Sequence, residues 1–152
     1  MSTTKRADVR LSNNAWEALM TAHASLMVSF GAESMWKEAS MREYDVLYTL
    51  AKHGEPMRIC EIQSGVLLSQ PALSRMIDRL TNRGLLARAA DAKDGRAVRV
   101  SLTEEGTRVQ QEIGRAHAKS VAREVGGALS PDELRELERL CRKLGAAVST
   151  AN

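Results

Sequence analysis

The sequence predicts a mainly α-helical protein with one small β-hairpin, and three observations support this fold class. Apolar residues recur at helical spacing through most of the 152-residue chain. Between residues 86 and 102 apolar residues recur at every second position instead, which is typical of strands, and Asp94-Gly95 between them is typical of a hairpin turn. Two capping boxes, at Ser40 and at Ser130, predict helix starts on either side of the hairpin.

The first part of the chain is expected to form two helices. An apolar stripe over residues 12–39 predicts a long amphipathic helix, in which Gly31 is a bend or a break. The capping box at Ser40 opens a second helix, which is expected to stop at His53-Gly54.

Two further helices are expected before the hairpin. A short one covers residues 60–67. Ser69 then caps a helix with Pro71 in its first turn, where the missing amide is tolerated, and this helix ends at residues 82–84. Its residues Leu73, Ile77 and Leu80 are spaced to face a core.

The hairpin is expected to pair strands over residues 86–91 and 97–102. Thr103 then begins a second long helix, and the capping box at Ser130 begins a last helix lined by leucines. The predicted order is four helices, a hairpin and two helices.

The excess positive charge of the chain lies in one 35-residue window. The whole chain has a net charge of +3, with 22 basic and 19 acidic residues. Residues 69–103 contain seven Lys or Arg against three Asp, a net charge of +4, whereas the remainder carries −1. This window coincides with the capped helix and the hairpin, which is typical of a nucleic-acid-binding surface.

A short helix, a turn, a second helix and a hairpin in this order predict a winged helix-turn-helix. A major groove about 12 Å wide admits one helix, which must present short polar side chains near its N-terminus. A basic hairpin can follow the adjacent minor groove. The residues expected to contact DNA are Ser69, Gln70, Pro71, Ala72, Ser74, Arg75 and Arg79 on the helix, and Lys93, Asp94, Arg96 and Arg99 on the wing.

Two alternatives remain open for this basic surface. The arginines at helical spacing also fit an ordinary solvated face, and Asp78 or its helical neighbours could engage Arg79. A winged helix that binds only other proteins is the alternative function, although such a module has no need of three cations on its wing.

Three sequence segments resemble the MarR family of bacterial transcriptional regulators. They read SQPALSRMIDRLTNRGL from Ser69, DAKDGR from Asp91 and LTEEG from Leu102. The wing pattern of that family is commonly Asp-x-x-Asp-Arg-Arg, and here Gly95 replaces the first arginine. The resemblance implies that Arg96, braced by Asp94, enters the minor groove.

The resemblance also implies that residues 1–152 form a single domain and that two such chains form an obligate homodimer. Residues 12–39 and 104–149 would be dimerisation helices, and residues 40–103 the DNA-binding part. Two winged domains would then bind a pseudo-palindromic operator, as expected for a repressor. The alternative is that the terminal helices cap the core of a monomer.

Members of this family are often released from DNA by small aromatic or phenolic anions, bound between the first, second and fifth helices. All five aromatic residues of the chain lie within its first 48 positions. The residues expected to form such a pocket are Trp16, His23, Met27, Tyr44, Leu47 and Tyr48. Packing in a core or a dimer interface is the alternative for these side chains.

A redox switch is a second regulatory hypothesis. Cys60 takes the position where a serine or threonine would cap the short helix, and a helix N-terminus favours the reactive thiolate. Cys141, among leucines of the last helix, is expected to be a small buried apolar residue.

Other functional classes are excluded by composition and motifs. The sequence contains no catalytic constellation, no cofactor-binding glycine loop and no metal-ligand spacing, so we expect a non-enzyme without cofactor or metal. Neither a signal peptide nor a membrane-spanning stretch is visible, so a cytoplasmic protein is expected.

Overall fold

The computed structural model describes residues 8–149, and the chain forms two compact units, Met1–Glu33 and Ser34–Asn152. Residues 1–7 lie outside the described residues, so the prediction that the N-terminal segment is not a signal peptide falls partly outside the structure. Among residues 8–149, no helix is both long enough and apolar enough to cross a membrane.

The described part of the first unit is dominated by helix α1 (Val9–Gly31). It begins earlier than expected because the carboxylate of Asp8 caps it, accepting the Leu11 amide at 3.0 Å. The Ser12 hydroxyl instead donates to the Asp8 carbonyl at 2.8 Å, one turn inside the helix. The expected extension to residue 39 is wrong: the helix ends at Gly31, and residues 32–39 form turns and bends, in keeping with the low helix propensity of glycine.

The second unit begins with helix α2 (Met41–His53), which has the predicted boundaries. The Ser40 hydroxyl accepts the Glu43 amide at 3.2 Å, and the Glu43 carboxylate accepts the Ser40 amide at 2.9 Å. Gly54 ends the helix with φ of +82°, a conformation that favours glycine.

The helix-turn-helix consists of α3 (Ile59–Gln63) and α4 (Gln70–Asn82). Helix α4 confirms the predicted Ser69 cap and its predicted end. Helix α3 is shorter than expected, and its N-cap is Arg58 rather than Cys60, because the Glu61 carboxylate accepts the Arg58 amide at 2.7 Å.

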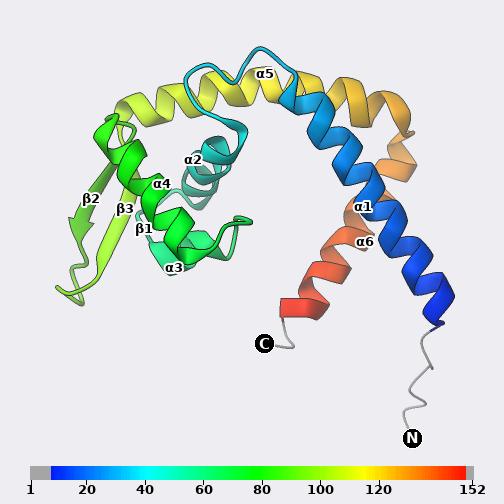
Figure 1. Cartoon of the computed structure of the whole chain (residues 1–152), viewed down its shortest axis with the longest axis horizontal. Coiled ribbons are helices and arrows are strands. Elements are labelled where there is room, and N and C mark those ends of the chain that lie inside the picture. The colour runs from blue at the N-terminus through cyan, green and yellow to red at the C-terminus, as the bar shows by residue number, and fades with distance from the viewer. Residues whose placement is uncertain (1–7, 150–152) are drawn as a thin grey trace, which may run out of the picture. The chain divides into compact units, whose positions relative to one another are not determined.

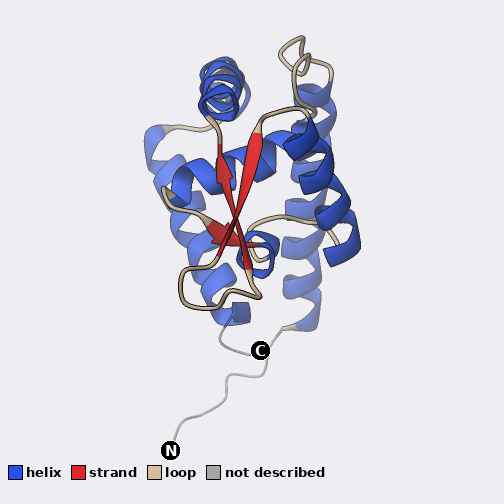
Figure 2. Cartoon of the chain, turned by 90° about the vertical axis from the view of Figure 1, so that its left-hand side faces the viewer, coloured by secondary structure: helices blue, strands red, loops and turns tan. Residues whose placement is uncertain are grey.

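A three-stranded antiparallel sheet follows the order β1-β3-β2, with strands β1 (Met57–Arg58), β2 (Leu86–Ala90) and β3 (Val98–Leu102). Figure 2 shows these strands gathered in one small sheet. The β2–β3 hairpin confirms the predicted wing. Sequence periodicity missed β1 because two residues are too few to reveal an alternation.

Two helices complete the second unit, α5 (Glu104–Ala128) and α6 (Pro131–Ser149). The predicted capping box at Ser130 forms, since its amide donates to Glu133 at 2.8 Å. No residue of α6 is buried; Leu134 is half-buried and the later leucines are exposed, as at Leu140 (48%) and Leu144 (53%). Figure 1 shows α6 following the long α5 at the C-terminal end.

The hydrophobic core of the second unit lies between α2, α4, the sheet and α5. Residues Leu73, Ile77 and Leu80 of α4 are fully buried, as their spacing predicted. They meet Val46 and Leu47 of α2 in the same cluster. Burial of this face leaves the opposite face of α4 toward solvent.

We expect Gly106→Ala to destabilise the protein. A Cβ at Gly106, in the first turn of α5, would lie 2.0 Å from the carbonyl oxygen of Leu85. Backbone cannot yield as a flexible side chain does, so we expect a loss of about 2 kcal/mol in the free energy of unfolding. Urea unfolding followed by circular dichroism measures it.

Gly126→Ala is the matched control in the same helix. A Cβ at Gly126 meets nothing within 4 Å, so the better helix propensity of alanine should raise stability by up to about 1 kcal/mol. Equal effects of the two substitutions would contradict the packing argument.

Candidate nucleic-acid interface

Helix α4 presents its polar face outward. Arg75 and Arg79 are exposed, on the side opposite the buried leucines. At the N-terminal end, Ser69, Gln70 and Pro71 are exposed and Ala72 and Ser74 are half-buried; the Ser69 hydroxyl accepts the Ala72 amide at 3.4 Å. The predicted contact residues therefore share one accessible end and face of the helix.

The tip of the wing is a tight turn built by Asp94. The Asp94 carboxylate accepts the Arg96 amide at 3.1 Å, and its carbonyl accepts the Ala97 amide at 3.0 Å. Lys93, Asp94 and Arg96 are all exposed. Within residues 8–149 only Gly54 and Gly84 have positive φ, so the turn does not require glycine at Gly95.

The base of the wing is held by a buried carboxylate that sequence reasoning did not single out. The side chain of Asp91 is 2% exposed. Its Oδ2 accepts Arg58 Nη2 at 2.8 Å and Arg99 Nε at 2.9 Å, and its Oδ1 accepts the Lys93 amide at 2.9 Å. Three segments of the sheet thus meet at one carboxylate.

This carboxylate offsets the repulsion between two arginines of the sheet. Arg58 of β1 lies directly opposite Arg99 of β3 in the antiparallel register. Like charges in that position repel each other. The hydrogen bonds from the Lys93 amide and then from Arg58 and Arg99 lower the pKa of Asp91 well below its usual range, so it stays ionised between the two guanidinium groups.

Arg99 therefore has a structural partner in addition to its predicted DNA role. Its guanidinium also donates to the Pro56 carbonyl at 3.1 Å and lies 3.9 Å from the Glu61 carboxylate. Two other basic residues of the window are engaged in the same manner. Arg83 pairs with Glu43 at 3.1 Å and also donates to the Glu38 carbonyl, and Arg88 of β2 pairs with Asp78 of α4.

Four basic side chains of the window make no ion pair or side-chain hydrogen bond within residues 8–149. These uncommitted cations are Arg75, Arg79, Lys93 and Arg96. Asp78 pairs with Arg88, so the alternative in which Asp78 engages Arg79 is wrong. Intramolecular pairing therefore engages three of the seven basic residues of the window and leaves these four without a partner among residues 8–149.

The residues of the expected effector pocket are divided between the two units. Trp16, His23 and Met27 lie on α1 and are exposed. Leu47 is fully buried in the core of the second unit. Tyr44 and Tyr48 line a cavity of about 470 Å³ between α2 and α5, together with Asp45, Gly114, His117, Ala118 and Val121.

The resemblance placed the fifth helix beside the pocket, but sequence reasoning named none of the α5 residues that line this cavity. The rings of Tyr44 and Tyr48 stack at 5.9 Å, and His117 lies 5.9 Å from Tyr44, edge to face. Gly114 makes the approach possible, because a Cβ there would lie 3.2 Å from the Tyr44 hydroxyl. No sequence spacing relates His117 to Tyr44, since 73 positions separate them.

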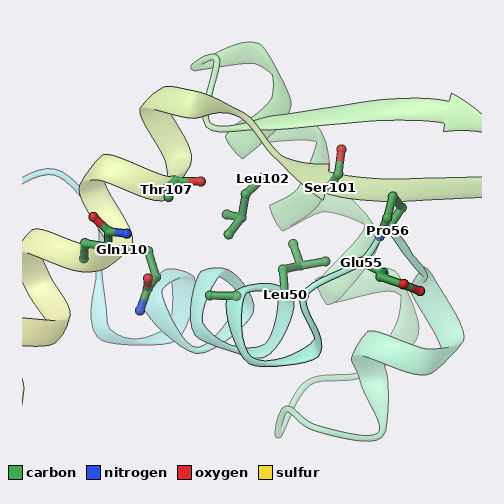
Figure 3. A pocket seen from close by; sticks show the side chains of 10 residues that line it. Leu50, Glu55, Pro56, Ser101, Leu102, Thr107 and Gln110 are labelled. Carbon is green, nitrogen blue, oxygen red and sulfur yellow. The ribbon is translucent and has the colours of Figure 1, made fainter.

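A second cavity, of about 430 Å³, lies where the end of α2, the end of β3 and the start of α5 meet. Figure 3 shows Leu50, Leu102 and Thr107 around it, with Glu55 and Pro56 at the turn after α2. None of the predicted site residues lines this cavity.

The redox hypothesis for Cys60 stays a prediction. Cys60 is exposed in the first turn of α3, and Cys141 is exposed on α6 rather than buried. The described residues contain no group of His, Cys, Asp or Glu that could hold a metal ion.

We expect Asp91→Asn to lower the melting temperature at neutral pH, because the facing Arg58 and Arg99 lose their shared anion. The folded-state pKa of Asp91 is depressed from 3.8, so its stabilisation is present above that value and disappears as pH falls below it. The difference from the parent protein should therefore shrink below about pH 4.

Thermal unfolding between pH 7 and pH 3 tests this expectation, with Asp78→Asn as the control. Asp78 pairs with Arg88 at the surface, where solvent screens the interaction, so its loss should have little effect. A pH-independent difference for Asp91→Asn would contradict the ionic explanation.

Comparisons with known proteins agree with this geometry. The family model described as "MarR family" matches residues 39–98. The chain is 38% identical over 103 residues to YkoM of Bacillus subtilis, an uncharacterized HTH-type transcriptional regulator, covering 68% of this chain and 66% of YkoM. It is 31% identical over 119 residues to the HTH-type transcriptional repressor MdtR of Bacillus subtilis, covering 78% of this chain and 76% of MdtR.

A solved structure extends the likeness to nearly the whole fold. AbsC, a MarR family transcriptional regulator from Streptomyces coelicolor, superimposes with a TM-score of 0.80 at 23% identity, covering 95% of this chain and 99% of AbsC. The chain belongs to the MarR family and is a transcriptional regulator with a winged helix DNA-binding fold.

Proposed function

We propose that this regulator is a homodimeric repressor that binds a pseudo-palindromic operator through α4 and the β2–β3 wing. The observation that carries the proposal is the set of four uncommitted cations, Arg75, Arg79, Lys93 and Arg96, on these two elements. The similarity to the repressor MdtR supports the direction of regulation.

The position of each cation indicates which part of the DNA it would contact. Arg75 lies near the N-terminal end of α4, where side chains reach base edges in a major groove. Lys93 and Arg96 lie at the wing tip, which fits the adjacent minor groove or its phosphates. The Arg88–Asp78 ion pair also joins β2 to α4 at the surface, so Arg88 is engaged within the protein.

Binding, rather than catalysis or protein interaction alone, is the function that these charges support. A protein-interaction module does not require exposed cations at a wing tip. Phosphate contacts, in contrast, require such groups and release counterions when they form.

The proposed dimer explains the apolar face of α6. Leu137, Leu140, Leu144 and Val148 are exposed at helical spacing, between 40% and 59%. An apolar stripe of this kind on a helix that buries no residue in its own unit indicates a second surface that covers it. In a symmetric dimer the two winged parts would contact half-sites about 34–36 Å apart.

We further propose that a small aromatic ligand in the cavity between α2 and α5 lowers DNA affinity. Tyr44, which lines this cavity, follows Glu43. Glu43 pairs at 3.1 Å with Arg83, the residue that caps the C-terminus of α4. A ligand that displaces the start of α2 would therefore act directly on the end of the recognition helix.

We expect Arg75→Ala and Arg96→Ala each to weaken DNA binding several-fold or more without unfolding the protein. Fluorescence anisotropy on a genomic fragment recovered by selection measures the affinity. A residue that contacts phosphate should also reduce the slope of log affinity against log salt by about one.

Lys119→Ala is the control for this experiment. Lys119 is an exposed cation on α5, outside the wing and the recognition helix, so its removal should leave the salt slope unchanged. Unchanged affinity in both arginine variants would refute DNA binding through this surface.

We expect the protein to sediment as a dimer at micromolar concentration and Leu140→Glu to dissociate it. A charge in a covered apolar stripe loses its hydration without gaining a partner. Leu67→Glu is the matched control, because Leu67 is 93% exposed in the turn before α4 and lies outside α6. A monomeric parent protein, or dissociation by both variants, would contradict the α6 interface.

A further inference from the structure

The cavity between α2 and α5 has a chemical character that the family resemblance does not imply. Its volume of about 470 Å³ is within the range of small-molecule sites. Its walls are mostly apolar or aromatic: two tyrosines from α2 face Gly114, Ala118 and Val121 of α5, with His117 between them. Such a site selects a ligand with an apolar body.

The ionisable groups of the lining indicate the charge of that ligand. Asp45 is the one carboxylate among the lining residues, and neither Lys nor Arg is among those that the structure describes there. Asp45 is exposed at the side of the cavity; partial desolvation raises its pKa, and the charges of Arg42 and of His117, which also lines the cavity, oppose that shift. Arg42 lies one turn earlier on α2, is exposed, and is outside the lining.

The aromatic rings of this cavity would also attract a cation. Tyr44 and Tyr48 stack at 28° between planes, and Trp36 lies 5.8 Å from Tyr44 and 5.5 Å from His117. Burial is the main reason that the pKa of Tyr44 is raised, and its phenol therefore stays neutral. The faces of neutral aromatic rings carry partial negative charge and attract cations.

An anionic ligand would meet the opposite conditions. Its carboxylate or phenolate would lose hydration beside Asp45, and the described lining offers it neither arginine nor lysine, only the imidazole of His117, whose charge already opposes that of Asp45. We propose that this cavity binds a hydrophobic organic cation, a quaternary or protonated amine on an aromatic body, in preference to a carboxylate or phenolate. The ligand preference is independent of the proposed function; only the effect of the bound ligand on DNA affinity rests on it.

Isothermal titration calorimetry of the full chain tests the charge preference with two probes of similar size. Benzyltrimethylammonium and phenylacetate share one aromatic ring and differ in the sign of their charge. We expect the cation to bind about tenfold more tightly. Equal or tighter binding of phenylacetate would overturn the proposal.

Substitutions identify the groups responsible. Asp45→Asn should weaken binding of the cation about threefold to tenfold and leave phenylacetate no weaker. Glu55→Gln is the control, because Glu55 is a carboxylate that lines the other cavity. An unchanged affinity for the cation in Asp45→Asn would overturn the role of this carboxylate.

A pair of substitutions at Tyr48 separates cation–π attraction from loss of packing. Tyr48→Phe keeps the ring face and should retain the affinity for benzyltrimethylammonium, whereas Tyr48→Leu should reduce it about threefold or more. Tyr48 is 46% exposed, so neither change should prevent folding. Equal affinities in the two variants would overturn the aromatic contribution.

DNA affinity measured with and without benzyltrimethylammonium distinguishes this inference from the proposed function. Binding of the cation with the expected variant pattern, but without a change in DNA affinity, would support the ligand class and overturn effector-controlled release. A lowered DNA affinity that disappears in Tyr48→Leu would support both.

Discussion

The wing depends on one buried carboxylate shared by two arginines. Arg58 and Arg99 face each other across neighbouring strands, an arrangement that would separate β1 from β3 without an anion between them. Asp91, at the end of β2, provides that anion and also accepts an amide of the wing turn. The same carboxylate thus connects the short first strand, the third strand and the base of the hairpin turn.

Pairing divides the basic window into a structural part and an exposed part. Arg83, Arg88 and Arg99 neutralise carboxylates that connect α2, α4 and the strands. The cations that remain lie on the outer face of α4 and at the wing tip. The net charge of the window therefore overstates the number of cations that have no partner among residues 8–149.

Helix α2 packs in the core, lines the aromatic cavity and is ion-paired to the end of α4. Its buried face joins the core through Val46 and Leu47, and its outer aromatic residues line the cavity against α5. Its first turn is linked to α4 through Glu43 and Arg83. This arrangement would link the proposed ligand to the end of α4, because a displacement of α2 would act on a direct ion pair.

Local signals in the sequence determined most element boundaries of this protein. The caps at Ser40, Ser69 and Ser130, the glycines at helix ends and the alternation of the hairpin act within a few residues, so they can be recognised without the fold. Tertiary structure decided the remainder: the two-residue strand β1, the burial of Asp91, the partner of each arginine and the meeting of Tyr44 with His117. These features depend on residues distant in sequence, whose proximity arises only when the helices and strands pack together.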